Sequence, residues 1–218
     1  MEIVWDSLDP AEWAARAGTG LQQSWRYGAV AAAMGARVRR ALVLDGGREV
    51  AVAQVLSRGG LRLCSRGPVW LAPVDRRAVL RRLGPMLATP AEGVAGWGLV
   101  PLVTPRHHAI WDLRPMPEAL RAGMAPKWRA RLRASERGGL APASDPAALG
   151  PLLAAEAVQR QARGYRALPA GFARAWPADE ALVLAYAPQG RVEAAALFLI
   201  HGTGASYHLA WASEAARA

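Results

Sequence analysis

The sequence predicts an α/β (α+β) fold built from two copies of one unit, with mixed, mostly antiparallel sheets flanked by helices. In the first half, two helical segments precede three short strand-like runs. The same order returns in the second half, and the first strands of the two copies begin at Ala41 and Ala181, 140 residues apart. This spacing exceeds the repeat of a solenoid and indicates a duplicated domain. We expect one domain at residues 1–120 and the other at residues 121–218.

Two helices are predicted ahead of the first strands. Asp9 caps the first helix, Asp9–Ala17, and Pro10 takes its first helical position, where a missing N–H costs nothing. The second helix covers Gln22–Met34, with Trp25 and several alanines near helical spacing and Gly35 just past its end. The alanines of this helix permit close packing.

An antiparallel meander follows these helices. Its three runs are β-branched or alternate between apolar and polar residues, and glycine-containing turns join them. The runs are Ala41–Leu44, Glu49–Ser57 and Leu61–Ser65, and the turns are Asp45-Gly46-Gly47 and Arg58-Gly59-Gly60. After the meander we expect a helix over Val74–Leu87, a buried strand over Gly96–Val103 reached by a crossover, and another strand over His107–Leu113.

The second half repeats these elements in the same order. The first copy continues after its third strand with a helix and further strands, whereas only Ser213–Ala218 follow the third strand of the second copy. We therefore expect the second copy to be incomplete. Its predicted helices are Leu149–Ala162 and Ala170–Trp176, its strands are Ala181–Ala187, Val192–His201 and Ala205–Ala212, and its turns are residues 188–190 and 202–204.

Composition narrows the functional classes. Lysine and arginine number 27 against 17 acidic residues, and the net charge of +10 favours anionic partners such as nucleotides, coenzyme A or RNA. Only Lys127 is a lysine, so codon bias explains part of the arginine excess. Cys64 is the single cysteine, which excludes an internal disulfide and a cysteine-based metal cage and predicts a small buried strand residue.

Nothing in the sequence predicts a membrane span or a secretion signal. No apolar run reaches the roughly 18 residues that cross a bilayer, and Met1–Asp6 lacks a basic region followed by an apolar one. We expect a cytoplasmic protein.

Four segments resemble the FemAB/GNAT-like acyltransferase family and occur in that family's order. They are Leu21–Gly28 (LQQSWRYG), Ser65–Trp70 (SRGPVW), Lys127–Glu136 (KWRARLRASE) and Ala205–Trp211 (ASYHLAW). The resemblance spans nearly the whole chain. It implies tandem GNAT-like (acyl-CoA N-acyltransferase-like) domains and transfer of an acyl or aminoacyl group from acyl-CoA or aminoacyl-tRNA to an amine, without a tightly bound cofactor.

The resemblance also implies binding residues. The Lys-x-Arg-x-x-x-Arg helix of such proteins lies near the substrate cleft, so Lys127, Arg129 and Arg133 are the expected anion contacts. The family continues past a strand like Tyr207–Trp211 into a helix that cradles the donor, which places donor contacts at Trp211, Ala212 and Ser213. Ser213 would cap that helix, whose N-terminal amides suit phosphate. A backbone N–H of the preceding strand would polarise the acyl carbonyl.

No catalytic base is assigned. His201 and His208 flank the last hairpin, and a three-residue turn would place His201 on one face with Tyr207 and Leu209 and His208 on the other. With this register, His201 and His208 could not form a single metal or relay site. His107 and His108 alternate faces in the same way and are interpreted, like the other two, as ordinary strand histidines.

Three further features have both a binding and a structural interpretation. The cations at positions 127, 129, 131, 133 and 137 surround a helix, which suits phosphate binding and also suits a solvated face. Tyr165 either closes the cleft over a substrate or tethers the preceding helix. Arg66 precedes Gly67-Pro68, which either holds its guanidinium at a fixed angle for a substrate or simply forms a turn.

Two other functions compete with the acyltransferase. One is a non-catalytic binding domain of the same fold, because an exposed last strand carrying Tyr207, Leu209 and Trp211 would pair into a homodimer. The other is an RNA-binding module, which the basic helix favours and the lack of aromatics interleaved with arginines disfavours. Added salt separates these two, because it weakens phosphate contacts and not apolar pairing.

Overall fold

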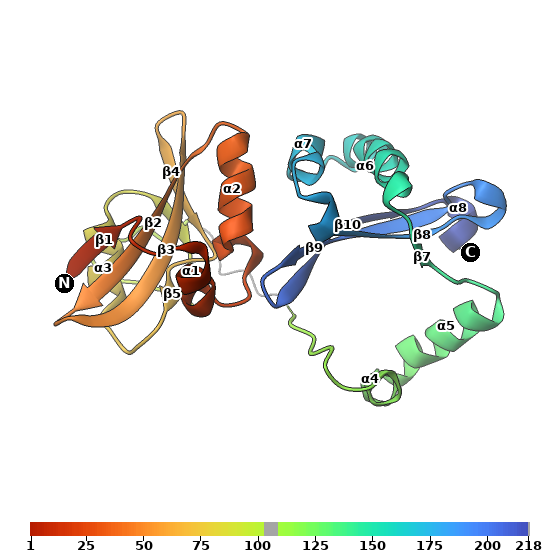
Figure 1. The fold of residues 1–218 in the computed structure, drawn as a ribbon, viewed down its shortest axis with the longest axis horizontal. Helices are drawn as coiled ribbons and strands as arrows, with labels where there is room; N and C mark the ends of the chain where they lie inside the picture. Colours follow the sequence, from red (N-terminus) through yellow and green to blue (C-terminus); the bar gives the residue numbers. More distant parts are fainter. Residues whose placement is uncertain (103–108, 218) are drawn as a thin grey trace. The chain divides into compact units, whose positions relative to one another are not determined.

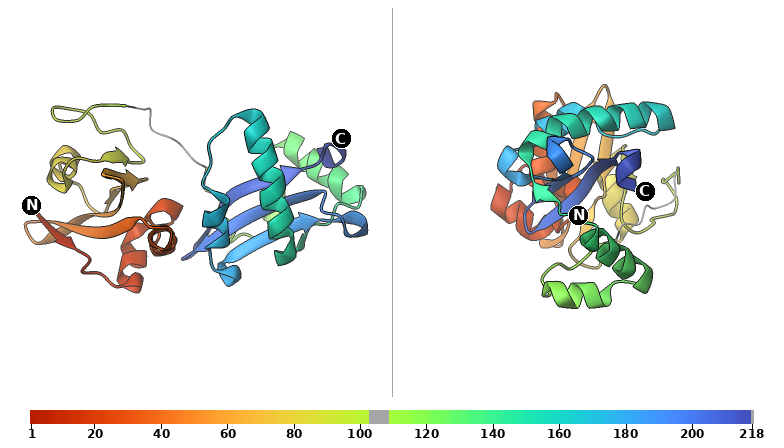
Figure 2. Two further views of the ribbon diagram at one scale, coloured as in Figure 1. Left: turned by 90° about the horizontal axis from the view of Figure 1, so that it is seen from above. Right: turned by 90° about the vertical axis from the view of Figure 1, so that its right-hand side faces the viewer.

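The computed structural model describes residues 1–102 and 109–217 (Figure 1). Its contacts divide the chain into two compact units. Unit 1 comprises Met1–His107, Ala167–Ala181 and Leu199–Tyr207, and unit 2 comprises His108–Arg166, Leu182–Phe198 and His208–Ala218. Helices and sheets occur together throughout the described residues (Figures 1 and 2), which confirms the predicted mixed α/β class.

Unit 1 contains a six-stranded sheet. The predicted meander forms its centre, and the two-residue turn between β2 and β3 consists of Gly46 and Gly47 with φ of 56° and 81°. Left-handed φ at both positions is the geometry of a tight hairpin turn. The sheet order is β1-β2-β3-β4-β6, with β5 also paired to β3. The strands are β1 (Glu2–Trp5), β2 (Arg37–Asp45), β3 (Arg48–Arg58), β4 (Leu61–Ser65), β5 (Val69–Trp70) and β6 (Leu87–Thr89).

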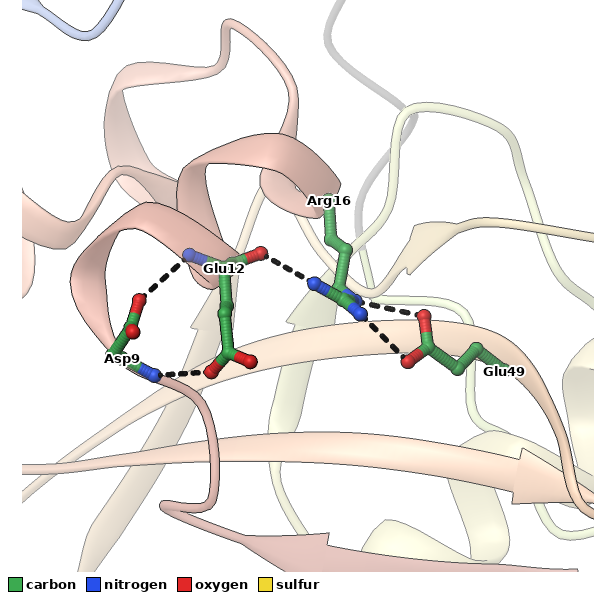
Figure 3. Close-up of polar contacts among 4 residues, drawn as sticks. All are labelled: Asp9, Glu12, Arg16 and Glu49. Atoms are coloured by element: carbon green, nitrogen blue, oxygen red, sulfur yellow. Dashed lines mark hydrogen bonds and ion pairs between the residues drawn. The ribbon is translucent and has the colours of Figure 1, made fainter.

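The first helix, α1 (Pro10–Ala17), begins as predicted. Asp9 Oδ1 accepts from the Glu12 N–H at 2.8 Å, and Glu12 Oε2 accepts from the Asp9 N–H at 2.9 Å (Figure 3). This reciprocal capping box satisfies two N–H groups that the helix leaves unpaired. On the last turn, Arg16 makes two bonds of 2.7 and 2.8 Å to the Glu49 carboxylate of β3, which fixes α1 against the sheet (Figure 3).

The second predicted helix is divided in two. A 3-10 turn, η1 (Leu21–Gln23), precedes α2 (Trp25–Ala33), and Ser24 between them caps α2 by accepting from the Tyr27 N–H at 3.1 Å. The segment Ala167–Ala181 of unit 1 contacts α2 and contains α7 (Ala170–Arg174) and η3 (Ala178–Glu180). The Tyr27 ring packs against the Phe172 ring at a tilt of 50° with centroids 5.1 Å apart, and Arg26 Nε donates to Glu180 at 2.6 Å.

The core of unit 1 lies between β3 and the elements around it. The buried stretch of β3 contributes four of its nine residues, and Cys64 of β4 is fully buried there, as the sequence predicts. Burial raises the pKa of the Cys64 thiol to about 12, so this cysteine behaves as a small apolar residue. The cluster consists of Ala41, Val43, Val50, Ala51, Ala53, Val55, Cys64, Val79 and Leu83.

The predictions that follow the first meander are partly wrong. The helix is shorter than expected: α3 (Arg76–Leu83) begins at its cap Asp75 and ends at Gly84-Pro85, which stops a helix. The parallel strand reached by the crossover is β6, which pairs with β4, and not Gly96–Val103. Residues 96–102 and 109–113 form no strand and are mostly exposed. Val103, His107 and His108 lie outside the described residues.

The strands of the second half form a four-stranded sheet in the order β10-β9-β8-β7. The meander of this sheet agrees with the prediction. The strand β7 and the helix α4 of the second half were not predicted, and neither was β1 of the first half. The strands are β7 (Ala143–Ser144), β8 (Ala181–Tyr186), β9 (Ala194–His201) and β10 (Gly204–Ala212). The remaining elements are α4 (Pro117–Gly123), α5 (Pro126–Arg137), η2 (Pro146–Ala148), α6 (Leu149–Arg163), η4 (Pro188–Gly190) and α8 (Glu214–Arg217). In residues 1–102 and 109–217, no helix combines the length and apolar character that a membrane crossing requires.

Candidate functional site

The three predicted anion contacts all lie on α5 of unit 2. Lys127 and Arg133 are exposed and make no hydrogen bond or ion pair to a described residue, so their charged groups are available to a ligand. Arg129 is half-buried and donates from Nη2 to the Met124 carbonyl at 3.0 Å, while its Nε is buried without a partner among the described residues. Arg129 is therefore partly committed to the chain.

Helix geometry separates these cations into two pairs. With about 3.6 residues per turn, Arg129 and Arg133 lie on one side of α5, and Lys127 and Arg131 lie on another. Arg131 holds its guanidinium 5.1 Å from the centroid of the Trp128 ring. An anion can reach one pair or the other, so the structure does not bring Lys127 onto the side of Arg129 and Arg133.

An ion pair joins α4 to α5. Arg121 of α4 donates to Glu136 of α5 at 2.6 and 3.0 Å. The Arg121 guanidinium, through this hydrogen bond, lowers the pKa of the Glu136 carboxyl below its usual value. Glu136 thus stays ionised and its charge also interacts with Arg133, but no cation of α5 forms an ion pair with a described carboxylate.

Tyr165 lies against α6 as a tether, and its side chain is 38% exposed. Its hydroxyl donates to Glu156 Oε1 at 3.1 Å and accepts from Gln159 at 3.4 Å. Glu156 is only 4% exposed and also pairs with Arg160 at 3.8 Å. The interpretation of Tyr165 as a tether has the direct support of these bonds, and its part in substrate binding stays a prediction.

Glu156 is a buried polar residue that sequence reasoning missed. It continues the helical stripe of Leu152 and Leu153, the two buried apolar residues of α6. A carboxylate on an apolar stripe signals a buried polar contact, and this signal was present in the sequence. Its charge reaches β10: burial lowers the pKa of His208, and the Glu156 carboxylate offsets part of that effect.

The predicted donor contacts lie where β10 ends. Ser213 caps α8 as expected, because its Oγ accepts from the Ala216 N–H at 3.1 Å. The Ser213 N–H itself donates to the Glu193 carbonyl at 2.8 Å and is not available to a donor. Hydrogen bonds from Ser213 and then Arg191 lower the pKa of Glu193. Trp211 and Ala212 are half-buried, and their contact with a donor stays a prediction.

Arg66 occupies the turn after β4 with φ of 57°. Its N–H donates to Thr89 Oγ1 of β6 at 3.0 Å, which ties the turn to the sheet. A Cβ at the following residue, Gly67, would lie 2.6 Å from Gln23 Nε2, so only glycine fits there. The backbone of this turn therefore has a structural role, and substrate binding by the Arg66 side chain stays a prediction.

A buried amide network that the sequence did not reveal joins two of the family-like segments. Gln23 Oε1 accepts from the Gln54 N–H at 2.7 Å, and Gln23 Nε2 donates to the Ser65 carbonyl at 2.7 Å. Trp13 Nε1 donates to the Gln23 carbonyl at 2.7 Å. Gln23 of η1 thus connects the turn before α2 to β3 and β4, and the segments Leu21–Gly28 and Ser65–Trp70 meet at this side chain.

Arg40 lies beside the same network. Its guanidinium is 3.5 Å from the centroid of the Trp25 ring and donates to the Trp25 carbonyl at 3.2 Å. Desolvation lowers the pKa of Arg40 to about 10, and Asp6 offsets part of that effect. Arg40 remains cationic at neutral pH and contributes a cation–π contact inside unit 1.

The predicted register of the last hairpin is wrong. The turn between His201 and Gly204 has two residues instead of three, and His201 Nε2 lies 2.8 Å from Ser206 Oγ. His201 therefore shares a face with Ser206 and not with Tyr207. Burial lowers the pKa of His201. Throughout the part of the chain that the structure describes, no cluster of three or more His, Cys, Asp or Glu side chains could hold a metal ion.

Comparison with known proteins identifies the fold. No sequence model of a protein family matches the chain, and no curated protein matches it either. Five solved chains match, among them the crystal structure of FemX, with a TM-score of 0.67 and 14% identity. The match covers 98% of this chain and 81% of the FemX chain. The chain thus has a FemX-like, GNAT-like fold, as the resemblance predicts; identity this low shows the fold alone.

Proposed function

We propose that this chain is an N-acyltransferase that moves an acyl or aminoacyl group from an anionic donor to an amine. The observation that carries the proposal is the FemX-like fold, which extends over 98% of the chain. The free cations of α5 support an anionic donor, for which acyl-CoA is the first choice and aminoacyl-tRNA the second. The proposed site of action is the cytoplasm.

Arg129 and Arg133 are the proposed donor contacts, with Lys127 as an additional contact on the neighbouring side of α5. Two guanidinium groups four residues apart can hold the oxygens of one phosphate, because each presents a planar fork of N–H donors. Such charge-assisted bonds contribute roughly 1.5–3 kcal/mol each.

The reaction itself requires a neutral amine, which attacks the acyl carbonyl carbon with its lone pair. The carbonyl oxygen then carries negative charge until the leaving group departs, as a thiolate from coenzyme A or as a ribose oxygen from tRNA. Backbone N–H groups near the end of β10 are the proposed donors to that oxygen. The amine loses its proton to a base, which we do not assign.

Titration of the purified chain with acetyl-CoA, coenzyme A and aminoacyl-tRNA, followed by transfer assays on a panel of amines, tests the proposal. Arg129→Ala combined with Arg133→Ala should weaken donor binding by about 10- to 100-fold, equivalent to roughly 1.4–2.8 kcal/mol. Arg82→Ala is the matched control, because Arg82 is also an exposed helical arginine without an ion pair to a described residue. Absence of binding to every donor, or equal losses in the control, would contradict the proposal.

A further inference from the structure

The stretch of residues 110–137, named here the arm, exposes large apolar side chains. It comprises the segment before α4, α4 itself and α5, and neither helix contains a buried residue. Figure 1 and the right-hand view of Figure 2 show α4 and α5 apart from α6 of the same unit. Soluble surfaces rarely gather so many large apolar groups without a partner. Five of them are 58–76% exposed: Ile110, Trp111, Leu113, Met116 and Trp128.

The arm is also cationic. It contains seven arginine and lysine residues against three carboxylates. Two of the carboxylates are already paired, Asp112 with Arg114 at 2.7 Å and Glu136 with Arg121 at 2.6 Å. All five cations of α5 lack an ion pair to a described residue, and only the Arg129 side chain donates a hydrogen bond to one, at the Met124 carbonyl; the five are Lys127, Arg129, Arg131, Arg133 and Arg137. The arm therefore presents a strongly positive charge, and a partner of complementary charge has an anionic surface.

The order of residues along α5 places cations beside the apolar stripe. Trp128 and Leu132 are four residues apart and lie on one side of the helix, and Lys127 and Arg131 border that side. The Arg131 guanidinium lies over the Trp128 ring at 5.1 Å. An apolar stripe with tryptophan, bordered by long cationic side chains whose stems can lie along apolar surface, is typical of helices that rest in a membrane interface.

RNA and an anionic membrane would both attract these cations, and the apolar residues decide between them. Nucleic-acid surfaces use flat aromatic rings as stacking platforms. Ile110, Leu113 and Met116 cannot stack on bases, but they can enter the boundary between lipid headgroups and acyl chains. We propose that the arm docks in the plane of an anionic bilayer, with Trp111, Met116 and Trp128 in the interface and with Arg131 and Arg137, which the proposed donor site does not use, on lipid phosphates.

Sedimentation of the full chain with lipid vesicles tests this docking. The chain should bind vesicles of phosphatidylcholine mixed with phosphatidylglycerol, and should bind pure phosphatidylcholine much less. Each cation contacting anionic lipid should contribute about fivefold in affinity. Trp128→Ser and Met116→Ser should each weaken binding about tenfold, because each removes a large side chain from the interface. Trp97→Ser is the matched control, since Trp97 is 85% exposed in unit 1 and lies outside the arm.

Other outcomes would overturn the docking. Unchanged vesicle binding by the Trp128 and Met116 variants would mean that the net positive charge alone adsorbs the chain, and equal losses for Trp97→Ser would remove the arm's special role. Binding of polyuridylate in a Trp128-dependent manner, without vesicle binding, would assign the arm to RNA. Met116 lies outside α5, so Met116→Ser should leave donor binding unchanged, and failure of docking would not affect the proposed transferase activity.

Discussion

Gly28, in the middle of α2, is a helix position where alanine should destabilise the protein. A Cβ built on Gly28 would lie 2.6 Å from Arg40 Nη2 and 2.8 Å from Gln54 Cδ, and closer still to Gln54 Oε1. Neither neighbour can move freely. Gln54 Nε2 donates to the carbonyls of Gln22 and Ser24 at 3.1 and 3.0 Å, and the Arg40 guanidinium is held against Trp25. If the Gln54 amide rotated, its oxygen would face the two carbonyl oxygens that now accept from its Nε2, and both hydrogen bonds would be lost.

The expected magnitude is the difference between two opposing effects. Alanine has a helix propensity better than that of glycine by about 1 kcal/mol, which favours Gly28→Ala. Against this, an extra methyl group in a packed interior costs roughly 1–3 kcal/mol. Displacement of Gln54 also breaks its two part-buried hydrogen bonds to Gln22 and Ser24, at about 1 kcal/mol each. The steric and hydrogen-bond losses are larger, so we expect Gly28→Ala to lower the free energy of unfolding by about 2–4 kcal/mol.

Urea denaturation followed by tryptophan fluorescence measures this change, because Trp13 and Trp25 lie beside the site. The matched control is Gly150→Ala, since Gly150 is a helical glycine of α6 with nothing within 4 Å of its added Cβ. The control should be neutral or stabilised by up to about 1 kcal/mol. If Gly28→Ala gained stability as Gly150→Ala does, the packing argument for the Gln54 and Arg40 contacts would be refuted.

Three further predictions concern unit 1. Asp9→Ala removes the capping box of α1 and should cost about 1 kcal/mol in urea denaturation, and an unchanged midpoint would contradict it. Cys64, with its pKa near 12, should resist a thiol reagent at pH 8 in the native state and react fully in denaturant, and rapid native labelling would show otherwise. Burial places the folded pKa of His201 below the unfolded value of about 6.5, so the folded state binds the proton more weakly. The contribution of neutral His201 to the free energy of unfolding is fully present above about pH 6.5 and is lost as the pH falls through the lower folded pKa. His201→Asn should flatten this pH dependence.

Local signals in the sequence predicted the elements that depend on local physics. The capping residues at Asp9 and the glycine pair at Gly46 and Gly47 determine where α1 begins and where β2 turns into β3, and both were predicted correctly. The strand β6 was missed because Met86 and Leu87 were read as the end of a helix over Val74–Leu87, although Gly84-Pro85 stops that helix first. The apolar residues of 96–102 suggested a buried strand, but composition does not distinguish a buried run from an exposed one.

Contacts between distant segments account for what the sequence did not reveal at the candidate site. The basic character of α5 follows from its own residues, but its division into two cationic sides and the bond of Arg129 to Met124 depend on the folded helix pair. The partner of His201 was predicted incorrectly because one residue fewer in the turn moves a side chain to the other face. Gln23 looked unremarkable because its partners lie 31 and 42 residues away.

The structure separates the four family-like segments into two kinds. Leu21–Gly28 and Ser65–Trp70 meet inside unit 1. Gln23 bonds to Ser65 there, and Gly28 and Gly67 are packed so closely that neither position has room for a Cβ. Lys127–Glu136 and Ala205–Trp211 instead contain exposed side chains, such as Lys127 and Tyr207. Substitution of Gln23, Gly28 or Gly67 should therefore change transfer activity only together with stability. Substitution of Lys127 or Arg133 should change donor binding at constant stability, and a variant of Gln23 that lost activity but kept its unfolding midpoint would contradict this division.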